Sequence, residues 1–196
     1  MKRLVCLLAA VLVLAVTGCD RQAARPLQFQ GVDVTGLQYA RGFTLTDHNG
    51  KVRTLNDFKG KIVLVFFGYT QCPDVCPTTM TEVASALQQL GPRAKEVQVL
   101  FVTIDPERDT QELLRQYVPA FDPSFLGLRG DAAQTAAVAK EFRVFYQKVE
   151  GSKPGVYSMN HTSGLFVFDK DGKVRLFETT GQGPAALASD LKQLLG

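Results

Sequence analysis

The chain of 196 residues is 45% hydrophobic and 21% charged, with a formal net charge of +3. These values are typical of a folded globular protein, and they exclude collagen-like, low-complexity and broadly disordered chains. The length favours a single domain. The sequence contains no run rich in lysine and arginine, so nucleic acid is not expected as a partner.

The N-terminus has the features of an export signal. Lys2 and Arg3 precede the mostly aliphatic stretch Leu4–Val16. As a helix that rises about 1.5 Å per residue, this stretch covers roughly 20 Å, which is too short for a bilayer core of about 30 Å. We therefore expect residues 1–18 to be a signal peptide.

Residues Leu14–Cys19 resemble a bacterial lipobox, in which cleavage leaves a lipid-modified cysteine as the first residue. We expect a lipid anchor on Cys19 and a tether over residues 19–38, and Asp20 resembles a signal for retention on the inner membrane. The alternative is an ordinary signal peptide in which Cys19 has no role. The folded domain, residues 39–196, is thus expected in a bacterium on the outer, periplasmic face of the cytoplasmic membrane, in an oxidising compartment.

Strands and helices alternate in the first half of this domain. An Asn-Gly turn signal between Phe43–Thr46 and Lys51–Thr54 predicts an N-terminal β-hairpin extension. The unbroken apolar run Ile62–Phe67 is typical of a strand that is covered on both faces. Apolar residues at helical spacing then predict a helix through Met80–Leu90, and a second buried strand follows at Val97–Ile104.

The second half adds further units of the same kind. Asp109–Glu112 resembles a capping box and predicts the start of a helix. A strand at Phe125–Leu128 and an Ala-rich helix at 131–142 are predicted next, followed by a strand at Val144–Val149 and a loop at 151–155. A hairpin then pairs Leu165–Phe168 with Val174–Phe177, and a closing helix starts near Pro184. Parallel strand–helix units followed by a hairpin and a closing helix are the order of a thioredoxin-like α/β domain.

Two cysteines, Cys72 and Cys76, remain once Cys6 is assigned to the signal and Cys19 to the anchor. They follow the first buried strand, at the strand end where open α/β sheets place their sites. Proline is tolerated in the first turn of a helix, so Pro77 indicates that a helix begins there with Cys76 at its N-terminus. The helix dipole is expected to lower the pKa of a thiol at that position.

The two histidines of the domain lie in different settings. His48 falls in the predicted hairpin turn, where a structural role is expected. His161 precedes the predicted strand Leu165–Phe168, and in a thioredoxin-like fold the loop that enters this strand lies against the cysteine loop. Two thiolates suit Cu(I) and leave coordination positions open, so His161 is predicted to join Cys72 and Cys76 as a metal ligand. The alternative is a hydrogen-bonded structural histidine.

Three further residues accompany this set. Asp105 follows the second buried strand and either approaches the metal site as an acid outside the ligand set or shapes the turn before Pro106. Asp109 is expected to cap the next helix. Met159 carries a thioether that suits Cu(I), but packing is its expected role.

Three segments resemble the signature stretches of the Sco/SenC family: Gly68–Pro77, Ile104–Thr110 and Asn160–Thr162. The resemblance extends from about Phe29 to the C-terminus. It implies a membrane-tethered, copper-binding protein of thioredoxin fold that serves assembly of the binuclear copper centre of cytochrome c oxidase.

By this resemblance, Cys72, Cys76 and His161 would be the copper ligands. The family often has an acidic residue where this chain has Asn160, so Asn160 and Asp105 are candidates to contact and orient the ligands. The implied partners are the copper-bearing subunit of cytochrome c oxidase or another copper protein, and a thiol reductant.

The spacing of the cysteines bears on the alternatives. A thiol–disulfide oxidoreductase is the main one, although dedicated enzymes of this fold usually carry CxxC and a proline before the third core strand. A peroxiredoxin-like peroxidase would need a threonine where Pro73 stands, and a zinc site would lack a fourth protein ligand. We therefore expect a copper metallochaperone whose Cys72–Cys76 dithiol could also reduce the cysteines of the acceptor.

Overall fold

The computed structural model describes residues 27–153 and 155–196. The predicted signal peptide, Cys19 and the first part of the predicted tether lie outside these ranges. Within them, no helix combines the length and the apolar character that crossing a membrane requires.

The main sheet has eight strands in the order β1-β10-β9-β4-β5-β6-β2-β3. Their bounds are β1 Val32–Asp33, β2 Thr44–Asp47, β3 Val52–Thr54, β4 Ile62–Gly68, β5 Val97–Thr103, β6 Leu126–Arg129, β9 Leu165–Phe168 and β10 Val174–Glu178. The central pairs β4–β5 and β5–β6 are parallel, and the other neighbours are antiparallel. The predicted α/β class is confirmed.

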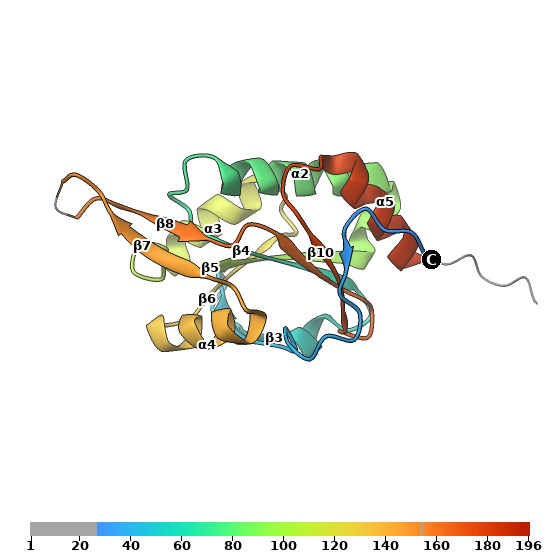
Figure 1. Cartoon of the computed structure of the whole chain (residues 1–196), viewed down its shortest axis with the longest axis horizontal. Coiled ribbons are helices and arrows are strands. Elements are labelled where there is room, and N and C mark those ends of the chain that lie inside the picture. Colours follow the sequence, from blue (N-terminus) through green and yellow to red (C-terminus); the bar gives the residue numbers. More distant parts are fainter. Residues whose placement is uncertain (1–26, 154) are drawn as a thin grey trace, which may run out of the picture.

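Helices cover both faces of this sheet (Figure 1): α2 and α5 lie on one side and α4 on the other. The helices are α2 Val75–Leu90, α3 Gln111–Tyr117, α4 Ala132–Phe142 and α5 Pro184–Leu195, with 3-10 turns η1 Leu55–Phe58, η2 Gly91–Glu96 and η3 Val118–Ala120. Asp131 caps α4, since its side chain accepts a hydrogen bond from the backbone N–H of Gln134.

The core is built on β4 and β5, whose residues are all buried, as the apolar runs predict. Successive side chains of a strand point to opposite faces of the sheet. Phe67 meets the ring of Phe142 in α4, with centroids 5.1 Å apart, whereas Phe66 packs against Phe101 at 6.1 Å on the opposite face. That opposite face carries α2, and the site described below lies there.

The N-terminal strands belong to the main sheet. β2 pairs with β3 across the Asn-Gly turn and also with β6, so the two strands form one edge of the sheet rather than a separate extension. At the other edge, β1 pairs with β10. The backbone N–H groups of Gln30 and Gly31 donate to the Asp190 carboxylate of α5 at 2.8–3.0 Å. The sheet therefore includes residues from the segment that the sequence assigns to the tether.

The segment before β9 differs from the prediction. Tyr157–His161 is expected as part of a loop, but it forms strand β8, which pairs antiparallel with β7 (Tyr146–Glu150) in a separate two-stranded sheet. We call this sheet the ribbon. It projects from the body of the molecule (Figure 1). His161 stands at its base, opposite Tyr146.

Candidate metal centre

Both cysteines lie between the end of β4 and the first turn of α2. The backbone N–H of Cys72 donates to the carbonyl of Tyr69 at 3.2 Å, which closes a turn, and the N–H of Cys76 points to the Cys72 sulfur at 3.4 Å. The helix starts at Val75, so Pro77 stands in its first turn as predicted. Both thiols are free; Cys76 is buried and Cys72 is half-buried.

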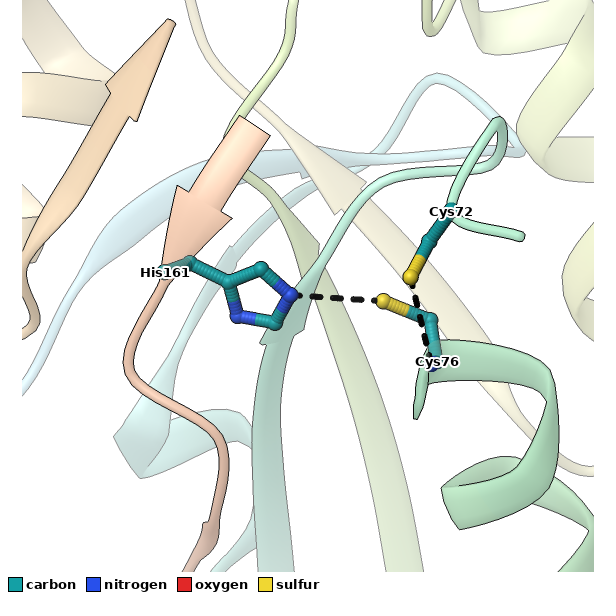
Figure 2. A group of neighbouring side chains, drawn as sticks. All are labelled: Cys72, Cys76 and His161. Atoms are coloured by element: carbon teal, nitrogen blue, oxygen red, sulfur yellow. Dashed lines mark hydrogen bonds between the residues drawn. The ribbon is translucent and has the colours of Figure 1, made fainter. Parts of the chain in front are cut away.

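His161 reaches these sulfurs from the ribbon (Figure 2). Its Nε2 lies 3.5 Å from the Cys76 sulfur. One donor atom from each of Cys72, Cys76 and His161 lies within 4.8 Å of the others, although 85 residues separate Cys76 from His161 in sequence. The structure thus brings the three predicted residues together. A cavity of about 230 Å³ is lined by Cys72, His161 and Asn160, among others, and opens the site to solvent.

The imidazole is oriented from its other side. Nδ1 of His161 lies 2.9 Å from the carbonyl oxygen of Thr162, which can only accept, so Nδ1 carries the proton and Nε2 presents a lone pair toward the sulfurs. The ring also stands edge-on to Phe66 and Tyr69, with centroid distances of 6.2 and 6.1 Å. Metal-binding histidines commonly donate such a hydrogen bond to a backbone carbonyl, because it fixes the tautomer and the plane of the ring.

The pKa expectation for Cys76 is wrong. Burial raises the pKa of this thiol well above its usual range, since removal from water disfavours the thiolate more than the backbone hydrogen bond at Tyr69 favours it. Cys76 is therefore a protonated thiol in the metal-free protein at neutral pH. A metal ion bound here would have to displace this proton, because cysteine binds metals as the thiolate.

Asp109 is not the helix cap that the sequence predicts. Thr110 is the N-cap of α3, with its side chain accepting from the backbone N–H of Leu113 at 3.2 Å. The buried Asp109 carboxylate instead accepts hydrogen bonds from the Thr70 backbone and hydroxyl and from the Thr103 hydroxyl. It thereby ties the cysteine loop to the end of β5. Burial raises the pKa of Asp109, and these hydrogen bonds oppose that shift.

Asp105 lies outside the group formed by Cys72, Cys76 and His161, and it contacts residues near them. Its carboxylate binds Arg108 Nε at 2.5 Å and the Tyr157 hydroxyl at 2.9 Å. Among the described residues, no hydrogen bond joins it to Cys72 or His161. Asp105 therefore acts on the site only through other side chains.

Asn160 has an exposed side chain that lines the cavity beside His161. Among residues 27–153 and 155–196, no hydrogen bond joins its amide to the imidazole, and the carbonyl of Thr162 holds the ring instead. Met159 is buried, as expected for a packing residue, and lines the same cavity.

His48 has the structural role that its turn position predicts. It is buried, and its Nδ1 accepts a hydrogen bond from the backbone N–H of Gly127 at 3.0 Å. Burial lowers the pKa of His48, so the ring is neutral at physiological pH.

Sequence comparison adds curated relatives. The mitochondrial SCO2 homolog of Bos taurus is 40% identical over 132 residues, which are 66% of this chain and 50% of that protein. An SCO2-like protein of Rickettsia felis is 36% identical over 132 residues, or 67% of this chain and 64% of that protein. The match thus spans between 50% and 64% of the length of these relatives.

Solved structures share the fold, and a family model covers most of the chain. ScoI of Bradyrhizobium japonicum with copper bound is 42% identical with a TM-score of 0.72, covering 78% of this chain and 97% of that one. Apo Sco1 of Thermus thermophilus is 39% identical with a TM-score of 0.77, covering 87% and 99%. The SCO1/SenC family model matches residues 34–196. The chain belongs to the SCO1/SenC family.

Proposed function

We propose that this chain is a copper metallochaperone that carries one copper ion on Cys72, Cys76 and His161. The observation that carries the proposal is the convergence of two sulfurs and one imidazole nitrogen within 4.8 Å. This is a soft donor set, which suits copper and leaves a position through which a receiving protein can coordinate the ion. The copper-bound relative of 42% identity supports the same cargo.

The cargo is delivered, on this proposal, to the binuclear copper centre of cytochrome c oxidase during assembly. The direct recipient is the copper-bearing subunit of the oxidase or another copper protein, and a thiol reductant keeps Cys72 and Cys76 reduced between cycles. A lipid on Cys19 holds the domain at the periplasmic face of the cytoplasmic membrane. Membership of the SCO1/SenC family supports this delivery role.

The arrangement of the sulfurs favours thiol–disulfide exchange as a second candidate function. Cys72 is half-buried and thus accessible, and Cys76 stands next to it as a resolving thiol. Oxidation of the two thiols to one disulfide releases two electrons and two protons, which reduce one acceptor disulfide to two thiols. The same chemistry prepares an acceptor with cysteine ligands to receive copper.

A Cu(I) competition titration of the reduced full chain tests the copper site. We expect one copper per chain, loss of binding in Cys72→Ser and in Cys76→Ser, and an affinity at least about tenfold lower in His161→Ala. With Cu(II), wild-type protein is expected to show sulfur-to-copper charge-transfer absorption that His161→Ala shifts. His48→Gln is the matched control, because an amide oxygen can replace the Nδ1 acceptor of that buried ring. Wild-type affinity in both cysteine variants would overturn the proposal.

A deletion strain separates the two candidate functions. If the chain delivers copper, added copper is expected to restore cytochrome c oxidase activity, whereas a purely redox role should not respond to metal supply. The anchor is tested separately by palmitate labelling of wild-type and Cys19→Ala protein, with label expected only in the wild type.

A further inference from the structure

Arg108 lies in the segment between β5 and α3, and its guanidinium is held in place by a buried acid. Its Nε donates to Asp105 Oδ2 at 2.5 Å, and the two side chains are only 17% and 4% exposed. The other carboxylate oxygen of Asp105 accepts from the Tyr157 hydroxyl at 2.9 Å. With both carboxylate oxygens engaged, the position of the guanidinium is fixed on the body of the domain.

The same guanidinium contacts both halves of the candidate metal centre. Its Nη1 donates to the backbone carbonyl of Tyr157 at 2.8 Å and to the Gln71 side-chain oxygen at 3.2 Å. Tyr157 begins β8, the strand that ends in His161, and Gln71 directly precedes Cys72. Arg108 therefore joins the histidine-bearing strand to the cysteine loop.

Aromatic contacts reinforce this junction. The centre of the guanidinium lies 3.5 Å from the Tyr157 ring centroid and 5.6 Å from that of Tyr69. Tyr69 in turn stands edge-on to the His161 ring. A planar cation that stacks on rings while its edge donates hydrogen bonds is a role for arginine that lysine does not reproduce.

The junction matters because the ribbon has its own backbone pairing. Within the part of the chain that the structure describes, β8 pairs with β7 and with no strand of the main sheet. His161 is therefore placed by the connection to β9, which begins four residues later and pairs with β4, and by contacts between the ribbon and the body. Met159 supplies a packing contact, the exposed Lys148 of β7 pairs with Glu107 at 3.7 Å, and Arg108 supplies the charged contact to β8.

We propose that Arg108 is a positioning residue for the metal centre, which holds the start of β8 against the cysteine loop and so keeps His161 within reach of the sulfurs. This inference rests on the proposed copper site for its effect on affinity, but its structural part does not depend on copper. Loss of Arg108 is expected to remove the contribution of His161 while the cysteine pair is retained.

A double-mutant cycle measures this dependence through the Cu(I) affinity of the reduced full chain. Arg108→Gln is expected to bind about tenfold more weakly than wild type, the effect typical of removing a residue that orients a ligand. In the His161→Ala background, Arg108→Gln is expected to cause no further loss, because the ligand it positions is already absent. Wild-type affinity in Arg108→Gln, or losses that multiply in the double variant, would overturn the proposal.

Two further variants keep the test sharp. Arg108→Lys retains a cation beside the buried Asp105, so it protects the fold if Arg108→Gln does not fold, but a single ammonium does not reproduce the bridge to Gln71 and Tyr157. Arg108→Lys is therefore expected to weaken copper binding as Arg108→Gln does, and to cause no further loss in the His161→Ala background. Arg53→Gln is the control, because it removes a comparable ion pair far from the cysteines. Arg53 Nε lies 2.8 Å from Oδ2 of the fully buried Asp47, at the far edge of the sheet. Arg53→Gln is expected to leave copper affinity unchanged, and a loss equal to that of Arg108→Gln would refute the specific role.

A metal-free measurement separates this inference from the copper proposal. In the reduced, metal-free wild type, nuclear Overhauser contacts are expected between the His161 ring and the rings of Phe66 and Tyr69, which lie 6.2 and 6.1 Å away by centroid. These contacts are expected to weaken in Arg108→Gln and Arg108→Lys but not in Arg53→Gln. Unchanged contacts in both Arg108 variants would overturn the positioning role even if copper binds as proposed. Weakened contacts would support it even if copper does not bind.

Discussion

Glu178 of β10 and Asp190 of α5 place two acidic side chains in the protein interior, only 3% and 0% exposed. Asp190 accepts hydrogen bonds from the backbone N–H groups of Gln30 and Gly31. Glu178 lines a small cavity together with Glu82 of α2. Burial first, and the Asp190 charge second, raise the pKa of Glu178 from 4.5 to about 7.

The direction of the pH effect follows from this shift. Because the folded state holds the Glu178 proton more tightly than the unfolded state does, the free energy of unfolding falls as pH rises from about 4.5 to about 7. At 1.36 kcal/mol for each step of one in pKa, the rise from 4.5 to about 7 amounts to at most about 3 kcal/mol. Below pH 4.5 the side chain is protonated in both states and the effect vanishes.

Glu178→Gln should remove this pH dependence. The protonated Glu178 can donate a hydrogen bond to Asp190, and the amide, which is nearly isosteric with the protonated acid, can donate there as well. We expect urea unfolding, followed by circular dichroism, to show equal stability of wild type and variant at pH 4.5 and a gain of up to about 3 kcal/mol for the variant at pH 8. Glu150→Gln, at a carboxylate that is 69% exposed, is the control and should follow the wild type. A variant that parallels the wild type across this range would refute the reasoning.

Three other substitutions test the fold and the site. In Gly68→Ala, the new methyl group would lie 2.9 Å from the Cys76 sulfur. We therefore expect the free energy of unfolding in urea to fall by about 1–3 kcal/mol and copper to bind more weakly in a titration. Unchanged copper affinity would contradict the packing around that sulfur. Thr110→Ala removes the hydrogen bond to the Leu113 N–H and should lower the free energy of unfolding by about 1 kcal/mol, and a neutral result would argue against the cap. Phe142→Ala empties a fully buried site and should cost about 3–5 kcal/mol in the same assay, with a loss below 1 kcal/mol speaking against it as a core residue.

The central strands and the cysteine helix could be predicted because their signals are local. Ile62–Phe67 and Val97–Ile104 are continuous apolar runs, and they form the buried strands β4 and β5. Proline restricts the start of a helix, so Pro77 placed the N-terminus of α2 next to Cys76. The convergence of His161 with this pair followed from the order of the elements, and the structure brings the three side chains together.

The errors arise where tertiary contacts decide. Tyr157–His161 alternates between less exposed and exposed side chains, but the pattern is only five residues long and has one fully buried member, Met159, so its pairing with β7 decides its structure. Asp109 and Thr110 are adjacent residues that both suit a helix cap. Contacts of Asp109 with residues of two other segments leave the cap to Thr110. The pKa of Cys76 follows burial, which the helix position alone does not reveal.

The ribbon has a practical consequence for protein engineering. The described residues of its tip, 151–153 and 155–156, are exposed and lie at the opposite end of β8 from His161. Insertions are tolerated best at surface tips of this kind, because the hydrophobic interior does not have to adjust. A fluorescent label or affinity tag grafted there would sit on the strand that carries His161, at the end away from the two cysteines.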